Sequence, residues 1–141
     1  MEVTVGRRFT FEAAHRLLHD RLSPCANLHG HRYEVTIEFT GEPMLSGKLC
    51  DFAALKECYI SPLMQKFDHA RLMNVLDSRL GIERDDKIVT FNDDPTVELI
   101  CRKILAACES GTQPVIVGNK FRVTKVRVWE TENCYAEINK P

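Results

Sequence analysis

The chain has 141 residues, of which 44% are hydrophobic and 28% are charged, and this predicts one globular domain over residues 1–141 rather than a disordered chain. The 19 Lys and Arg residues against 20 Asp and Glu residues give a formal net charge of -1, which excludes a global electrostatic attraction to nucleic acid or to an anionic membrane. No stretch has the apolar length that a bilayer requires and no signal-peptide pattern opens the chain, so we expect a cytoplasmic protein.

Two strands are predicted at the start of the chain, separated by an irregular segment over Leu17–Leu28. Apolar side chains fall mostly at odd positions over Met1–Ala13, and the alternation returns over His31–Thr40 until Gly41-Glu42-Pro43 ends it. A period of two residues is typical of strands with one buried face. We expect the two strands to pair antiparallel.

Three histidines share the parity of the apolar face of these strands. His29 and His31 flank a glycine, so both rings point to one side of an extended chain, and His15 keeps the parity of the first strand. A lone histidine on an apolar face is usually a hydrogen-bonded core residue, but three together leave ring nitrogens unpaired unless a cation accepts their lone pairs. Zinc is the usual ion for three nitrogen ligands and keeps a fourth position open. The sequence therefore predicts a zinc site.

Cys25 differs from the other five cysteines because it lies in the irregular segment, four residues before His29. In a reducing compartment all six are expected to be thiols, and the other five are expected to be ordinary core or surface residues. Two interpretations of Cys25 stay open at this point. As a fourth ligand it would close a CysHis₃ site, whereas a thiol held just off the metal would suit proton abstraction or nucleophilic attack.

Two helices are expected in the middle of the chain. The first begins at a capping residue, Asp51, and is kinked by Pro62. The second begins at Asp94-Pro95 and ends at Ser110-Gly111, after an irregular stretch over Asp77–Asp94. The apolar positions of the first helix recur at spacings of three and four residues, at Phe52, Leu55, Tyr59, Leu63 and Phe67.

Two more strands are predicted over Phe121–Glu130 and Tyr135–Ile138. A shift of parity between Val123 and Val126 indicates a β-bulge in the first of them. The order β-β-α-α-β-β predicts an α+β fold, in which two helices cover one face of a four-stranded antiparallel sheet. The edge strands of such a sheet offer unpaired backbone groups that a partner subunit could extend.

Three charged or titratable residues at the ends of these elements have two interpretations each. Asp68 and His69 follow the first helix, where they would satisfy helix-end carbonyls or solvent, although a carboxylate beside an imidazole can also form a proton relay. Glu130 ends a strand next to Trp129. It is either an exposed strand end or an anchor for a ring rich in N–H groups, because a carboxylate accepts two parallel hydrogen bonds. Spacing alone decides neither case.

Six motifs, in this order and from the first strand to the last, resemble the 6-pyruvoyl-tetrahydropterin synthase / 6-carboxy-tetrahydropterin synthase family. The motifs are Phe11–Leu17, Cys25–His31, Asp51–Lys56, Phe67–His69, Pro95–Glu98 and Trp129–Thr131. The resemblance implies the tunnelling fold (T-fold), in which subunits join through edge strands into a barrel. It also implies a homohexamer, a dimer of trimers, with active sites at subunit interfaces.

The resemblance further implies a role for each candidate residue. Zinc would be the cofactor, held by His15, His29 and His31. Cys25 would be the catalytic base and would stand off the zinc. Asp68 and His69 would be its proton relay, Glu130 would anchor the pterin, and Thr96 would be a further pterin contact in the loop that opens the second helix.

The implied substrate is a small molecule, 7,8-dihydroneopterin triphosphate, with neither nucleic acid nor a membrane as a partner. The carboxy enzymes convert it to 6-carboxy-5,6,7,8-tetrahydropterin, acetaldehyde and triphosphate, on the path to queuosine and other 7-deazapurines. The pyruvoyl enzymes release triphosphate and stop at a diketone. The short Cys-x₃-His-x-His spacing, with Leu28 before His29, resembles the bacterial carboxy branch and favours the carboxy product.

Two departures from the bacterial pattern and one rival function accompany this interpretation. Ala70 replaces a second histidine that is common after Asp-His, and the stretch over Asn74–Asp94 is longer than in the shortest members. The alternative enzyme is a 6-pyruvoyl-tetrahydropterin synthase. The alternative from another class is a non-enzymatic zinc module, in which Cys25 and the three histidines close a tetrahedral structural site.

Overall fold

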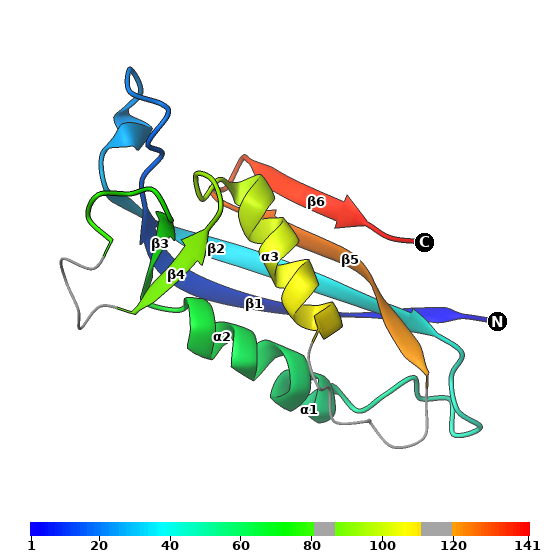
Figure 1. The fold of residues 1–141 in the computed structure, drawn as a ribbon. Helices are drawn as coiled ribbons and strands as arrows, with labels where there is room; N and C mark the ends of the chain where they lie inside the picture. The colour runs from blue at the N-terminus through cyan, green and yellow to red at the C-terminus, as the bar shows by residue number, and fades with distance from the viewer. Residues whose placement is uncertain (81–86, 111–119) are drawn as a thin grey trace.

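The computed structural model of the protein describes residues 1–80, 87–110 and 120–141. Within these ranges one sheet has six strands in the order β4-β3-β1-β2-β5-β6, and the helices cover one of its faces (Figure 1). The strands are β1 (Val3–His15), β2 (His29–Gly41), β3 (Ala70–Asn74), β4 (Ile88–Phe91), β5 (Phe121–Trp129) and β6 (Tyr135–Asn139). The described helices are α1 (Phe52–Leu55), η2 (Lys56–Ile60), α2 (Ser61–Phe67), α3 (Val97–Ser110) and the short 3₁₀ turn η1 (Pro24–Ala26).

The predicted antiparallel sheet is confirmed for β1, β2, β5 and β6, but the expectation of four strands is wrong. β3 and β4 add two short strands that run parallel to β1 and to each other. β4 falls inside the stretch that we expected to be irregular. The two segments have five and four residues. Runs this short show no clear period, so neither strand can be identified from its own residues.

The pairing of β1 with β2 matches the expected parity over its whole length. The register joins Val3 to Gly41 at one end and His15 to His29 at the other, so β2 begins two residues earlier than predicted. The bulge expected between Val123 and Val126 is confirmed, because the β2 to β5 register shifts between Glu38 and Phe39. One face of these strands forms the buried core with the helices.

The first predicted helix is interrupted by the π-helical segment η2. The Ser61 N–H donates to the carbonyl of Lys56, five residues back. Pro62 follows and has no N–H to donate, so the wider turn is the form that the expected kink takes. Asp51 stands at the N-cap but its side chain makes no capping bond. Phe52 is 58% exposed rather than buried, because the first side chain of α1 to reach the core is Leu55.

The second predicted helix is confirmed as α3, but its cap is not Asp94. The Leu99 N–H donates to the Thr96 hydroxyl at 3.3 Å, and Thr96 therefore occupies the capping position. Asp94 is buried instead and takes part in a different set of contacts described below. None of the described helices is long and apolar enough to cross a membrane.

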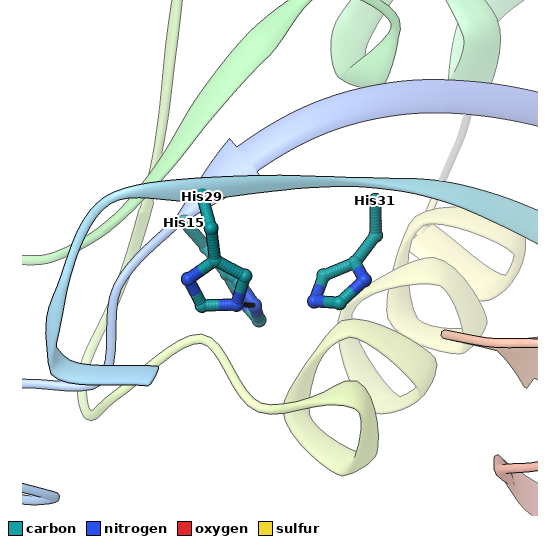
Figure 2. A group of neighbouring side chains, drawn as sticks. All are labelled: His15, His29 and His31. Atoms are coloured by element: carbon teal, nitrogen blue, oxygen red, sulfur yellow. Dashed lines mark hydrogen bonds between the residues drawn. The ribbon is translucent and has the colours of Figure 1, made fainter. Parts of the chain in front are cut away.

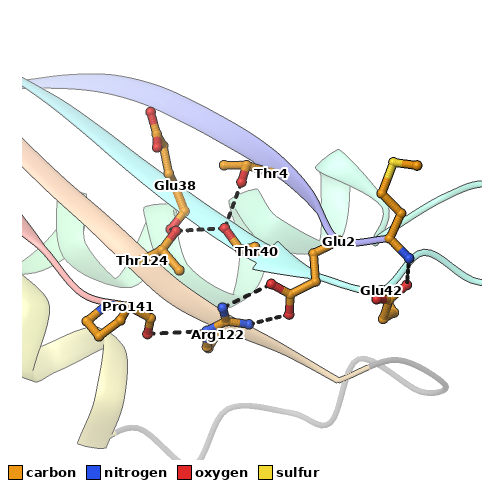
Figure 3. A network of polar contacts seen from close by, with 9 residues as sticks. Glu2, Thr4, Glu38, Thr40, Glu42, Arg122, Thr124 and Pro141 are labelled. Atoms are coloured by element: carbon orange, nitrogen blue, oxygen red, sulfur yellow. Dashed lines mark hydrogen bonds and ion pairs between the residues drawn. The ribbon is translucent and has the colours of Figure 1, made fainter.

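The face of the sheet away from the helices is polar. Figure 3 shows one part of it, where the hydroxyl of Thr40 on β2 lies 2.7 Å from that of Thr4 on β1 and 2.8 Å from that of Thr124 on β5. Near the same end, Arg122 donates two hydrogen bonds to the carboxylate of Glu2. On this face, side-chain hydrogen bonds thus link the three longest strands in addition to the hydrogen bonds of the backbone ladders.

Candidate metal centre and active site

Three histidines meet where β1 ends and β2 begins. His15 is paired with His29 across the two strands, and His31 is paired with Ala13, so strand alternation sends all three rings to the helix-covered face. Their ligand nitrogens lie within 4.8 Å of one another. Figure 2 shows the three rings projecting to the same side of the strands. The structure therefore brings together the three residues that the sequence predicted as one ligand set.

Two backbone carbonyls fix which ring nitrogens face inward. His15 Nδ1 lies 2.8 Å from the carbonyl oxygen of Pro95, and His29 Nδ1 lies 2.7 Å from that of Asn27. Because a carbonyl only accepts hydrogen bonds, each Nδ1 carries the proton and each Nε2 of a neutral ring keeps its lone pair. The two Nε2 atoms are only 3.0 Å apart. Two facing lone pairs require a shared proton or a cation between them.

Burial makes a shared proton unfavourable at this site. The side chain of His15 is 1% exposed, and burial lowers its pKa to about 4 despite the hydrogen bond to Pro95, with His29 and His31 lowering it further. Burial also lowers the pKa of His31, although Glu130 opposes this. Neutral imidazoles with converging lone pairs are the donor set that a divalent metal ion prefers. The three residues therefore fit a metal ion.

Glu130 lies directly beside the histidines. Its Oε1 atom is 3.5 Å from His15 Nε2 and 3.8 Å from His31 Nε2. The residue follows β5 and opens the turn to β6, in which its N–H donates to the carbonyl of Cys134. The carboxylate contributes to a raised pKa of the buried Tyr33 hydroxyl, for which burial is the main cause. A carboxylate next to a metal set can orient a ligand bound there.

Cys25 lies in the 3₁₀ turn η1, outside the ligand set formed by the three histidines. Its N–H donates to the hydroxyl of Ser23, and its carbonyl accepts from the N–H of Leu17, two residues beyond His15. The side chain is half-buried. These bonds fold the loop back onto the end of β1, so the loop that carries the thiol joins the strand ends that carry His15 and His29.

Asp68 and His69 are held against β1 at Glu12. Asp68 Oδ1 accepts from the N–H of Glu12 at 2.9 Å, and the N–H of His69 donates to the Glu12 carbonyl at 2.6 Å. The second carboxylate oxygen of Asp68 lies 2.9 Å from His69 Nδ1. The bond from Glu12, aided by His69 and opposed by partial burial, lowers the pKa of Asp68. Asp68 therefore fixes the orientation of an imidazole, as a proton relay requires.

The His69 ring lies apart from the three-histidine set. His69 has a φ of 59° and a side chain that is 76% exposed. It lines an open depression of ≈ 430 Å³ to which Glu12, Arg32 and His31 also contribute. Glu12 and Arg32 face away from the helices by strand alternation. Thus the rings of His15, His29 and His31 point to the helix-covered face, whereas His69 lies beside residues whose side chains point to the other face.

Sequence reasoning missed the groups that orient the candidate metal ligands. The carbonyls of Pro95 and Asn27 carry no signal in the side-chain pattern, and Asp94-Pro95 indicates only the start of a helix. Thr96, predicted as a ligand contact, directly follows the Pro95 carbonyl, while its hydroxyl accepts from Leu99 as the helix cap. The adjacency of a helix start to the end of β1 could be found only from the structure.

Comparisons with known proteins all find similarity to tetrahydropterin synthases. Residues 4–141 match the family model for 6-pyruvoyl tetrahydropterin synthase. The chain is 30% identical over 139 residues to a 6-carboxy-5,6,7,8-tetrahydropterin synthase of Rickettsia conorii, covering 94% of this chain and 96% of that protein. It is also 30% identical over 149 residues to a putative 6-carboxy-5,6,7,8-tetrahydropterin synthase of Pyrococcus abyssi, covering 96% and 92%.

Two solved structures share the fold. The 6-pyruvoyl tetrahydropterin synthase of Caenorhabditis elegans matches with a TM-score of 0.71 at 24% identity, covering 100% of this chain and 97% of that one. The 6-pyruvoyltetrahydropterin synthase of Plasmodium vivax matches with a TM-score of 0.77 at 19% identity, covering 99% and 98%. At these identities the likeness supports the fold alone.

Proposed function

Because the chain belongs to the 6-pyruvoyl tetrahydropterin synthase family, we propose that it is a zinc-dependent enzyme that converts 7,8-dihydroneopterin triphosphate to 6-carboxy-5,6,7,8-tetrahydropterin, acetaldehyde and triphosphate, with consumption of water. The fold is the T-fold of this family. Relatives named for the 6-carboxy product, at 30% identity over nearly the whole chain, support that product. The observation that carries the proposal is the convergence of three imidazoles beside the Glu130 carboxylate.

Zinc is the ion that we assign to His15, His29 and His31. Their donor set is nitrogen only, and three protein ligands leave a coordination position for the substrate. When bound, zinc supplies a Lewis acid that stabilises negative charge developing on a side-chain oxygen of the substrate. The carbonyls of Pro95 and Asn27 support this role, because they hold His15 and His29 in the tautomer whose Nε2 is free to bind.

Cys25 and His69 are the residues that we propose to move protons. The Cys25 thiolate would remove protons from the side-chain carbons of the substrate, and His69 would return them, so that hydrogen passes from the side chain to the ring. Asp68 accepts from one ring nitrogen of His69 and so leaves the other to face the substrate. This exchange converts a dihydropterin to a tetrahydropterin without a nicotinamide cofactor.

Glu130 and Thr96 are the proposed pterin contacts. The Glu130 carboxylate would accept two parallel hydrogen bonds from the N–H groups of the pterin ring, and its position 3.5 Å from His15 would place the substrate side chain toward the metal. The Thr96 hydroxyl accepts from the N–H of Leu99 in α3. It still has a proton to donate to a bound ring.

The site is proposed to be completed by a second subunit. The metal set faces the helices, whereas His69 lines a depression on the polar side of the sheet. In the described residues, β3 pairs with β1 only over Ala13–His15, so before Ala13 the side of β1 opposite β2 has no strand beside it. β6 is the edge strand at one end of the sheet. Pairing between such edges builds closed rings of subunits. We therefore propose a homohexamer, a dimer of trimers, in which His69 serves a neighbour's metal site.

An acetaldehyde assay tests this function directly. The purified protein with zinc is incubated with 7,8-dihydroneopterin triphosphate, and acetaldehyde and triphosphate are measured together. We expect both in equal amounts. Triphosphate without acetaldehyde would instead assign the protein as a 6-pyruvoyl-tetrahydropterin synthase, and neither product would refute the proposed enzyme. A cytoplasmic location and a place in queuosine synthesis stay predictions.

A further inference from the structure

A buried carboxylate stands behind the most buried of the proposed metal ligands. Asp94 is 7% exposed and directly precedes Pro95, whose carbonyl oxygen accepts from His15 Nδ1 at 2.8 Å. The N–H of Thr96 donates to the Asp94 carbonyl at 2.8 Å, which closes a tight turn around Pro95. The backbone of this turn therefore sets the direction in which the Pro95 carbonyl points.

The side chain of Asp94 ties the same turn to the chain just beyond His15. Its Oδ2 atom accepts from the N–H of His19 at 2.9 Å, and the N–H of Leu18 is a further donor. Its Oδ1 atom accepts from the side-chain amide of Asn74 at 3.1 Å, and Asn74 itself is buried. Asp94 thus joins three segments, the loop after β1, the end of β3 and the start of α3.

We propose that Asp94 is a positioning residue for His15, which sets the metal affinity of the three-histidine site without touching the metal. It holds the segment that follows His15 with its side chain, and it holds the acceptor of the His15 ring with its backbone turn. The ring of His15 and the backbone that follows it are thereby both held through Asp94. The inference rests on the metal site proposed above, because it assigns a role only toward a metal held by His15.

Asp94 also belongs to a second group of residues that could bind a cation, and this alternative role has to be distinguished from the proposed one. His19, Asp93 and Asp94 form another group whose possible ligand atoms lie within 4.8 Å of one another. Both oxygens of Asp94 already accept hydrogen bonds from the chain, whereas the side chains of His19 and Asp93 are both 68% exposed. These bonds favour a structural carboxylate over a ligand of a second ion. Asp93 Oδ1 accepts from the N–H of Asp94 at 2.8 Å, and because an asparagine oxygen keeps this bond, Asp93→Asn offers a matched control at the adjacent position.

The first measurement compares the zinc affinities of Asp94→Asn, Asp93→Asn and the unmodified protein by competition with a chromophoric chelator. We expect Asp94→Asn to lose about 10-fold to 100-fold in affinity, as substitutions of groups that orient metal ligands do, and Asp93→Asn to keep the original affinity and stoichiometry. The absorption spectrum with Co²⁺ in place of zinc should change only in Asp94→Asn, because the His15 ring is then held differently. Unchanged affinity and spectrum in Asp94→Asn would overturn the inference, and so would the loss of one metal equivalent in both variants.

A second measurement needs no metal. In ¹⁵N-labelled protein, the buried Nδ1–H of His15 should give a slowly exchanging proton resonance in the unmodified chain and in Asp93→Asn, and this resonance should shift or vanish in Asp94→Asn. If the unmodified protein binds no zinc, the proposed function fails while this resonance still decides whether Asp94 orients His15. Should Asp94→Asn not fold, Asn74→Ala removes one partner of Asp94 and is expected to weaken zinc binding in the same direction, and unchanged binding would count against the inference.

Discussion

Replacing Asp77 by asparagine is expected to lower the free energy of unfolding by about 2 to 3 kcal/mol at pH 7. Arg16 donates to both carboxylate oxygens of Asp77, at 2.7 and 2.6 Å. The two side chains are 19% and 2% exposed, so the loss should stay below the roughly 3 to 5 kcal/mol of a fully buried pair. Asparagine keeps the size and one acceptor but loses the charge. For a chain of this length the change corresponds to a fall in Tm of about 7 to 10 °C.

The pH dependence of this loss provides a sharper test. Hydrogen bonds from Arg16 lower the pKa of Asp77, although burial acts in the opposite direction. Because the folded pKa lies below the unfolded value of about 3.9, the pair stabilises the fold above about pH 4 and this stabilisation is lost as the pH falls through the folded pKa. The difference in Tm between the variant and the unmodified protein should be full at pH 7 and should shrink below pH 4.

Thermal unfolding followed by circular dichroism measures this difference, with all proteins at one concentration because assembly also stabilises a fold. Asp20→Asn is the matched control, since Asp20 is exposed and its described hydrogen bonds are made by its backbone N–H and carbonyl, which the substitution keeps. An equal Tm for Asp77→Asn and Asp20→Asn at pH 7 would refute the reasoning. A difference that persists undiminished at pH 3 would show that shape, rather than charge, is responsible.

Three further predictions concern the proposed active site. Cys25→Ala should keep the full zinc content and lose turnover, whereas loss of zinc together with unfolding would support the rival closed structural site. Cys25→Ala and His69→Ala should each be inactive, yet subunits mixed after dissociation should recover about a quarter of the sites if Cys25 and His69 act across an interface; no recovery would place both in one subunit. Glu130→Gln should raise KM for the pterin substrate by about 10-fold to 100-fold with unchanged zinc content, and a matching loss of zinc would show that Glu130 binds the metal instead.

The histidine site was predictable because it depends on two long strands. Antiparallel pairing and alternation determine the side of every residue on β1 and β2, so His15, His29 and His31 could be placed together from parity alone. Glu130 lies beyond the last paired residue of β5, where alternation no longer fixes a direction. Spacing therefore left its position open, and the structure places its carboxylate beside His15.

The features that could not be predicted depend on contacts distant in the chain. β3 and β4 are parallel strands whose short sequences have no period of their own. β3 pairs with residues of β1 that lie more than 50 positions earlier in the chain. His69 has left-handed backbone geometry, which a non-glycine residue adopts only when its surroundings hold it there. The pairing with Glu12 that holds it is likewise invisible in the local sequence.

The 13-residue ladder between β1 and β2 would make binding of the proposed metal ion depend on correct strand pairing. A slip of one residue in this pairing would send His15 to the opposite face of the sheet, and a slip of two would separate it from His29 by about 7 Å along the strands. Only the register that joins Val3 to Gly41 also joins His15 to His29. An ion that needs both imidazoles would thus bind only to chains with the native strand register. Its binding would stabilise these chains relative to folding intermediates with the wrong register.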